Sequence, residues 1–230
     1  MSSLDSGSTI AFDRKPIAYP VKNRRVAVGG RVKRLLDISL AALGLIVLLP
    51  LFALVALAVK LTSSGPVLYG HSRIGFRGRT FRCWKFRSMV SNGDEVLEAH
   101  FKSHPEDRRE WEVNRKLRED PRVTKLGAVL RAYSVDELPQ LLNVLRGDMS
   151  FVGPRPVVRD ELENYGTDAM HYLNTRPGIT GLWQISGRSD VDYDQRVALD
   201  SSYVRNWSFG TDCLIILKTV PAVVAARGSY

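Results

Sequence analysis

"LLDISLAALGLIVLLPLFALVALAVKL", residues Leu35–Leu61, is the most hydrophobic stretch of this 230-residue chain. Its 20 residues from Leu40 to Val59 carry no charge. A helix of that length rises roughly 30 Å, at about 1.5 Å per residue, which is enough to cross the hydrocarbon core of a bilayer. The stretch starts too far into the chain, and runs too long, for a simple signal peptide. It predicts a helix embedded in a membrane.

Pro50 lies in the middle of this stretch, where it removes one helix hydrogen bond and introduces a kink. Both flanks are basic, and positive charge prefers the cytoplasmic side of a membrane. The flanking cations are Arg31, Lys33 and Arg34 before the stretch, and Lys60, Arg73, Arg77 and Arg79 after it. Two arrangements therefore stay open: a kinked helix that crosses the membrane, and a re-entrant hairpin that bends at Pro50 and returns to the cytoplasmic face. A buried core helix is a third alternative.

The net charge of +9 is concentrated before the hydrophobic stretch. Residues 1–34 hold eight Lys and Arg against two Asp, which gives +6 of the total. Positive charge beside a membrane segment indicates attraction to anionic lipid. A nucleic-acid binder would instead carry basic residues interleaved with aromatic ones. We therefore expect an anionic membrane lipid as a partner and no nucleic acid.

The rest of the chain predicts a mixture of helices and a small hairpin. "VLYGHSRIGFRGRTFRCWKFRSM", residues 67–89, contains β-rich runs on both sides of a glycine turn. Residues 92–120 are highly charged and predict helix interrupted at Pro105. Residues 175–189 predict a loop, residues 192–207 a helix, and residues 212–227 an apolar segment for the core or the membrane surface.

The expected fold class is α+β, mainly α, with a re-entrant membrane helix, amphipathic interfacial helices and a small β-hairpin around a compact catalytic domain. The expected division is a disordered basic tail over residues 1–30, the membrane hairpin over residues 31–62, and a cytoplasmic catalytic domain over residues 63–230. The two cysteines, Cys83 and Cys213, are too few for a disulfide framework.

Two adjacent carboxylates stand out in "YSVDELPQLLNVLRGDMSFVGPRP", residues Tyr133–Pro156. Asp136 and Glu137 precede an apolar stripe at i, i+3, i+4 and i+7, formed by Leu138, Leu141, Leu142 and Leu145. In one interpretation Ser134 and Glu137 form a capping box, and Asp136 only favours the positive end of the helix. In the other interpretation the acid pair is catalytic.

The catalytic interpretation rests on the chemistry of carboxylates near phosphate. A helix N-terminus should hold the pKa of Asp136 low and keep the side chain ionised as a nucleophile or metal ligand. A carboxylate that attacks a diphosphate needs cations to offset charge repulsion. The candidates are Mg²⁺ and the side chains of Lys85, Arg87, Arg131, Arg155, Arg176 and Arg188.

Three segments resemble the motifs of the bacterial monotopic phosphoglycosyl transferases. They are "KFRSM" (Lys85–Met89), "DELPQLLNVLRGDMSFVGPRP" (Asp136–Pro156) and "TRPGITGLWQISGR" (Thr175–Arg188). The motifs occur in the expected order, and the resemblance extends from about Arg31 to the C-terminus. It implies transfer of hexose-1-phosphate from a UDP-hexose, either UDP-glucose or UDP-galactose, to undecaprenyl phosphate. UMP is released, in the first membrane step of exopolysaccharide synthesis.

The resemblance also implies roles for residues. Asp136 is the covalent nucleophile, Glu137 completes the dyad, both are Mg²⁺ ligands, and Arg131 and Lys85 assist catalysis. The implied substrate-binding residues are Arg87, Pro154, Arg155, Pro156, Arg176 and Arg188. The resemblance favours the re-entrant hairpin with Pro50 as its hinge, although Leu49 stands where many members have Ser. It places the protein on the cytoplasmic face of the bacterial inner membrane and allows a homodimer. A catalytically inactive membrane adaptor is the alternative function.

Overall fold

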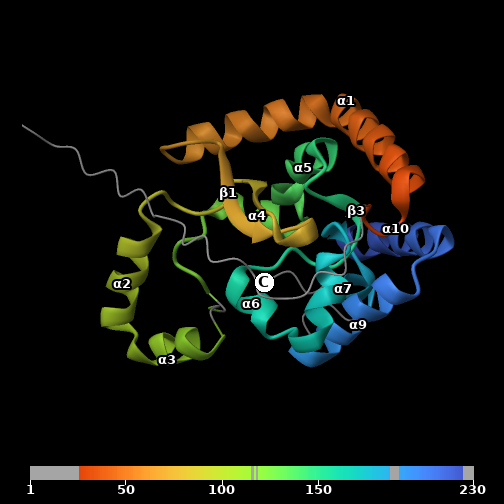
Figure 1. Cartoon of the computed structure of the whole chain (residues 1–230). Coiled ribbons are helices and arrows are strands. Elements are labelled where there is room, and N and C mark those ends of the chain that lie inside the picture. The colour runs from red at the N-terminus through yellow and green to blue at the C-terminus, as the bar shows by residue number, and fades with distance from the viewer. Residues whose placement is uncertain (1–25, 115–116, 118, 187–191, 225–230) are drawn as a thin grey trace, which may run out of the picture.

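The computed structural model describes residues 26–114, 117, 119–186 and 192–224. A long bent helix lies across a mainly helical body, and a helical pair projects to one side (Figure 1). The helices are α1 (Gly30–Thr62), α2 (Gly93–Ser103), α3 (Pro105–Asn114), α4 (Lys125–Ala132), α5 (Gln140–Arg146), α6 (Arg159–Glu163), α7 (Ala169–Leu173), α8 (Leu182–Ile185), α9 (Tyr193–Arg205) and α10 (Phe209–Val224). The strands are β1 (Leu68–Ile74), β2 (Thr80–Phe86), β3 (Ser150–Val152) and β4 (Gly178–Thr180), and the 3₁₀ turns are η1 (Phe76–Gly78), η2 (Val135–Glu137) and η3 (Gly166–Asp168).

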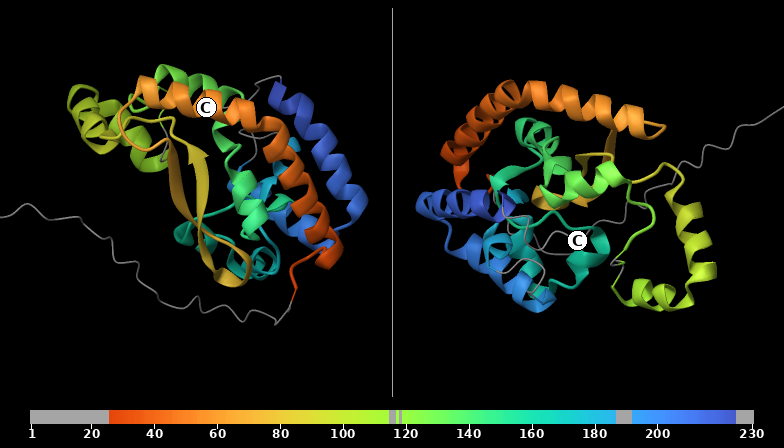
Figure 2. Two further views of the ribbon diagram at one scale, coloured as in Figure 1. Left: turned by 90° about the horizontal axis from the view of Figure 1, so that it is seen from above. Right: turned by 180° about the vertical axis from the view of Figure 1, so that it is seen from behind.

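Helix α1 runs through Pro50 as one bent helix, which the two views of Figure 2 show from above and from behind. Its inner side chains Ala41, Val55 and Val59 are buried against the body. Its outer side chains are exposed and apolar, with 73% of Ile46 and 66% of Leu49 accessible. A helix buried in the core would be covered on all sides, so this alternative is not supported. The length and composition of α1 are sufficient to cross a membrane.

The first two strands form the predicted antiparallel hairpin, with Ile74 opposite Thr80. The turn between them includes Gly78 at φ 74° and Arg77 at φ 60°. Lys85 pairs with Tyr69, and its side chain projects from the face of the hairpin that turns toward η2. Asn143 of α5 fixes this strand in place, because its side chain accepts from the Trp84 amide and donates to the Arg82 carbonyl.

A second, parallel pair of strands was not predicted. β3 pairs with β4, with Ser150 beside Gly178 and Val152 beside Thr180. The predicted loop over residues 175–189 therefore contains a strand and the single helical turn α8. Glycine is required here, because a Cβ on Gly178 would lie 2.2 Å from the Gly153 amide nitrogen. The pairing holds the segment from Gly153 to Pro156 beside Arg176.

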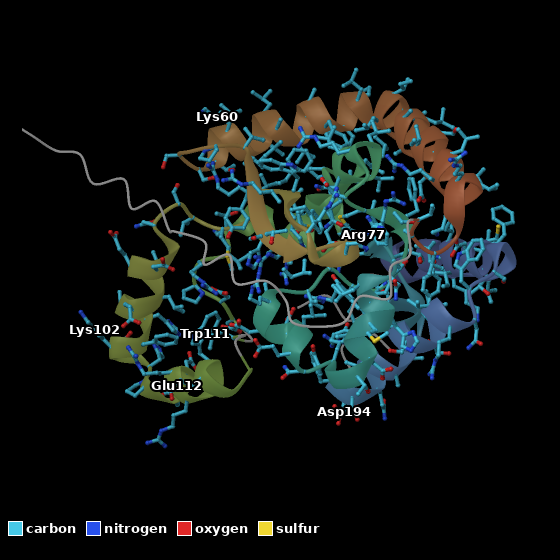
Figure 3. The ribbon with its side chains drawn as sticks, in the orientation of Figure 1. Lys60, Arg77, Lys102, Trp111, Glu112 and Asp194 are labelled. Carbon is cyan, nitrogen blue, oxygen red and sulfur yellow. The ribbon has the colours of Figure 1, made fainter. Side chains whose placement is uncertain are left out.

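The charged segment forms two helices with a break at His104, directly before Pro105, which is close to the predicted break at Pro105. Leu97, Phe101 and Leu117 form a small separate core with Trp111. Trp111 and Glu112 mark α3 in Figure 3, to one side of the main body.

Helix α10 is joined to the start of α1 by Asp212. This buried carboxylate pairs with Lys33 and accepts hydrogen bonds from the Tyr203 hydroxyl at 2.7 Å and the Trp207 indole at 3.1 Å. The helix packs into the core through Ile215, which is fully buried, whereas 71% of Leu217 is exposed. Its predicted position at the membrane surface stays a prediction.

Residues 1–25 of the predicted basic tail lie outside the described residues. Ala27 and Val28 are buried, and the Val28 amide donates to the Asn174 carbonyl at 3.1 Å. Both cysteines are free thiols.

Candidate active site

The acid pair lies on η2, a three-residue 3₁₀ turn between α4 and α5. Ser134 begins the turn in the left-handed region, at φ 55°. Val135 and Leu138 pack into the apolar cluster beneath α1 that contains Val55 and Val59. Because these two side chains anchor the turn to the core, Asp136 and Glu137 between them face the hairpin.

The capping-box interpretation is wrong. Ser134 makes no side-chain capping bond. Glu137 Oε1 instead accepts from Lys85 Nζ at 2.5 Å, and Lys85 Nζ also lies 3.8 Å from Asp136 Oδ2. The acid pair is therefore organised around a lysine from β2, 52 residues away in the sequence for Glu137.

The pKa of Asp136 is raised, not lowered as expected. Burial raises it most, Lys85 and Arg131 act in the opposite direction, and the result is a pKa of about 6. Only 5% of Asp136 is exposed, and desolvation disfavours its charged form. The helix-end effect that the sequence suggested is weak, because η2 is one short turn.

The neighbours of Asp136 have the opposite tendencies. Burial acts to raise the pKa of Glu137, but the charge and hydrogen bond of Lys85 outweigh it and hold this pKa below its usual value. Burial acts to lower the pKa of Lys85, but Glu137 and Asp136 raise it above its usual value. At neutral pH Glu137 is ionised, Lys85 is protonated, and Asp136 is mostly ionised and close to its titration point.

The structure brings three of the six predicted cations to the acid pair. Lys85 contacts both acids directly. Arg131 lowers the pKa of Asp136, and its Nε donates to Ser88 Oγ at 2.9 Å. The charge of Arg155 lowers the pKa of Glu137. These charges compensate the anionic groups that the site would hold.

Two predicted substrate-binding arginines make hydrogen bonds within the protein, and their substrate-binding roles stay predictions. Arg87 is 8% exposed and donates to the Pro66 carbonyl and to Ser63, which ties the hairpin to the end of α1. Arg176 Nε donates to the Gly147 carbonyl at 2.8 Å, at the end of α5. Arg188 lies outside the described residues.

The Pro154–Pro156 segment continues from β3 and is held by β4, because the Gly178 amide donates to the Pro154 carbonyl at 2.8 Å. Pro154 is buried and Pro156 is partly buried. The backbone amide and the charge of Arg155 both act to lower the pKa of the buried Asp200 on α9. This rigid segment aims the Arg155 side chain, whose guanidinium stacks on Trp183 at 5.5 Å from the ring centre.

Sequence reasoning did not single out the chemistry of His71 and Arg73. Both project from the same face of the hairpin as Lys85. Their cross-strand partners Cys83 and Phe81 lie two and four residues before Lys85 on β2, and residues two apart on a strand share a face. Arg73 contacts His71 Nδ1 at 3.2 Å and pairs with Glu161 at 3.3 Å. The two-residue period of side chains along the predicted hairpin would have placed them on the same face as Lys85.

The carboxylates of the site are compatible with one kind of Mg²⁺ site. The described residues contain no group of three or more potential His, Cys, Asp or Glu ligands. Asp136 and Glu137 supply two carboxylates, and protein-bound Mg²⁺ often takes one or two carboxylates together with substrate phosphates and water. The residues present fit that arrangement, whereas they do not form a complete protein cage.

Comparison with known proteins places this geometry in a family. Residues 28–226 match the family model for bacterial sugar transferases. The chain is 58% identical over 203 residues to the exopolysaccharide production protein ExoY of Sinorhizobium fredii, covering 88% of this chain and 90% of that protein. It is 41% identical over 216 residues to the UDP-glucose:undecaprenyl-phosphate glucose-1-phosphate transferase of Caulobacter vibrioides, covering 90% and 74%.

A longer relative matches over only part of its length. The undecaprenyl-phosphate galactose phosphotransferase of Salmonella typhimurium is 51% identical over 221 residues, which cover 95% of this chain and 46% of that protein. The family model and the relatives agree with the resemblance carried by the three sequence motifs. The chain therefore belongs to the bacterial sugar transferase family and is a phosphoglycosyl transferase.

Proposed function

We propose that this protein transfers hexose-1-phosphate from a UDP-hexose to undecaprenyl phosphate, through a covalent intermediate on Asp136, as the first membrane step of exopolysaccharide synthesis. The observation that carries the proposal is a buried, ionisable Asp136 held beside Lys85 and influenced by the charge of Arg131, with Arg155 acting on the adjacent Glu137. The names of the relatives support undecaprenyl phosphate as acceptor and glucose or galactose as the sugar. An inactive adaptor would not require this charged arrangement.

In the first step, an Asp136 carboxylate oxygen attacks the sugar-linked phosphorus of the donor. The new bond is an acyl phosphate, the bond from phosphorus to the bridging oxygen breaks, and UMP leaves with the electron pair. Lys85, Arg131 and Arg155 offset the negative charge that gathers on the phosphoryl oxygens. Asp136 is both nucleophile and leaving group, and a pKa of about 6 suits both roles.

In the second step, a phosphate oxygen of the lipid attacks the same phosphorus. The acyl–oxygen bond to phosphorus breaks, Asp136 regains its carboxylate, and the hexose is left on a lipid diphosphate. The soluble donor and the lipid acceptor therefore use one site in turn, which gives ping-pong kinetics.

Mg²⁺ belongs to the proposal as a cofactor held by Asp136 and Glu137. When bound with the substrate phosphates, it would supply positive charge to the phosphoryl oxygens. Glu137 then has either of two roles, as a metal ligand or as a proton acceptor, and it also keeps Lys85 oriented through the 2.5 Å hydrogen bond.

The membrane arrangement is proposed from the exposed side of α1. We place the bent helix in the cytoplasmic leaflet of the bacterial inner membrane as a re-entrant element with Pro50 as its hinge. Its exposed apolar face and the basic residues at its two ends, such as Arg31 and Lys60, fit a bilayer with anionic lipid. The catalytic residues then lie beneath the helix on the aqueous side, and a homodimer is compatible with this placement.

The decisive experiment omits the lipid. Full-length protein is mixed with UDP-glucose or UDP-galactose labelled in the sugar, and both UMP and labelled protein are measured. Peptide mapping should locate the label on Asp136, and added undecaprenyl phosphate should remove it. If UMP appears only when both substrates are present and no labelled protein forms, direct transfer replaces the covalent mechanism.

A further inference from the structure

A second cationic group lies where α8 meets α9. The guanidinium carbon of Arg155 lies 5.5 Å from the centre of the Trp183 ring, and that of Arg196 lies 4.4 Å from the same centre. Two positive charges are therefore held close together on one indole. The proposed mechanism uses Arg155 but gives Arg196 no role.

The surrounding acids only partly neutralise this pair. Burial, and then repulsion from Arg155, lower the pKa of Arg196. Asp200 has a pKa raised by burial to about 7, so it carries only part of its negative charge at neutral pH. Glu161 is engaged by Arg73 at 3.3 Å. The excess of positive charge around Arg155 and Arg196 favours an anion.

Buried hydrogen-bonding groups at the same place lack partners. Nε of Arg196 and Nε1 of Trp183 are both buried donors with no hydrogen-bond partner among the described residues. Most buried polar groups in proteins are satisfied, so unsatisfied ones mark places where a polar ligand or ordered water completes the bonding.

We propose that Arg196 acts with Arg155 to bind the phosphate of the departing nucleoside monophosphate. This inference rests on the proposed function, because it assigns the leaving group of that reaction. Arginine suits the role, since its planar guanidinium can donate two parallel hydrogen bonds to a phosphate while one face stays stacked on an aromatic ring.

The position of α9 favours the nucleotide over the lipid phosphate. Asp194, two residues before Arg196, lies at the far side of the molecule from Lys60, which marks the end of α1 (Figure 3). The lipid acceptor arrives at the α1 side, whereas a soluble nucleotide reaches α9 from the aqueous side. The proximity of Arg155 to Glu137 connects this phosphate position to the reacting centre.

The test compares a nucleotide with its nucleoside. Binding of UMP and of uridine is measured with the full chain in lipid nanodiscs, for wild type, Arg196→Met, Arg196→Lys and the control Arg205→Met. Arg205 is exposed on the same helix and carries the same charge. We expect Arg196→Met to weaken UMP binding about 10- to 100-fold and to leave uridine binding unchanged. Arg196→Lys should recover part of the loss, and Arg205→Met should bind both as wild type does.

Three outcomes would overturn the assignment. If Arg196→Met bound UMP as tightly as wild type does, Arg196 would not contact the phosphate. Equal losses for UMP and uridine would indicate a purely structural role. Unchanged UMP binding with a raised KM for a short-chain polyprenyl phosphate would assign Arg196 to the lipid. Failure of the covalent mechanism is separate, because it would appear in wild type as the absence of a labelled adduct on Asp136.

Discussion

At the scale of single residues, the site depends on the raised pKa of Asp136. Its cause is burial, and Lys85 only partly offsets that effect. When the pKa of an acid is higher in the folded state than in the unfolded state, the protein loses stability as the pH rises from the lower pKa to the higher one. The reason is that the unfolded state accommodates the charged form of the acid more easily. The cost is absent below about pH 4, where Asp136 is protonated in both states, and complete above its folded pKa of about 6. Ionised Asp136 therefore reduces the stability of the fold at neutral pH.

Asp136→Asn should abolish transfer and stabilise the protein. Asn keeps the shape but has no nucleophilic oxygen, and it removes a buried charge whose cost is on the order of 1–3 kcal/mol. At pH 7.5 the thermal midpoint should rise or stay equal while UMP release stops, and the stability difference should shrink toward pH 4. A large loss of stability at pH 7.5 would contradict this account of Asp136.

Lys85→Met should move the pH profile of the first half-reaction. Lys85 is the main group that lowers the pKa of Asp136, so its removal should raise that pKa further above about 6. The rate of UMP release in single-turnover experiments should fall, and its acidic limb should shift to higher pH. Lys102→Met, on the projecting helix α2, is the matched control and should leave the profile unchanged. An unshifted acidic limb in Lys85→Met would show that a group other than Asp136 controls it.

At the scale of helices and strands, the membrane placement depends on α1. Single cysteines are introduced at Arg31 and Lys60 in a Cys213→Ser background, with Cys83 left in place because it is buried. A re-entrant helix has both ends on the cytoplasmic side, so a membrane-impermeant thiol reagent should label neither position from the periplasm and both in inverted vesicles. Periplasmic labelling of either position would establish that α1 crosses the membrane.

The elements differ in how far the sequence predicts them. The hairpin over residues 67–89 and the helix break at Pro105 follow from local signals, a glycine turn and a proline. The β3–β4 pair could not be predicted, because strands of three residues have no readable period and their pairing joins distant segments. The Ser134–Glu137 spacing suggested a cap, but a lysine distant in sequence takes the Glu137 side chain. Burial of Asp136 is likewise a tertiary property, so its raised pKa could not be predicted from the residues around it.

At the scale of the whole molecule, the fold separates two surfaces. The exposed apolar side of α1 faces away from the body, and the acid pair lies beneath the helix among Lys85, Arg131 and Arg155. Val135 and Leu138 connect the two, because they pack against the inner side of α1 next to Asp136. Under the proposed membrane placement, this connection would bring a lipid phosphate close to Asp136.

The proposed need for Mg²⁺ would be a property of the whole assembly of protein, nucleotide and lipid. The described residues offer two adjacent carboxylates and no larger ligand group, so most of the metal's remaining ligands would come from substrate phosphates and water. Excess EDTA should therefore abolish UMP release, and Mg²⁺ should restore it without refolding. The thermal midpoint of the substrate-free protein should change little on chelation, because two carboxylates beside a protonated Lys85 bind a metal weakly. Adding UDP-hexose should make that midpoint depend on Mg²⁺. Full turnover in excess EDTA would remove the metal from the mechanism and leave Lys85, Arg131 and Arg155 as the whole of the charge compensation.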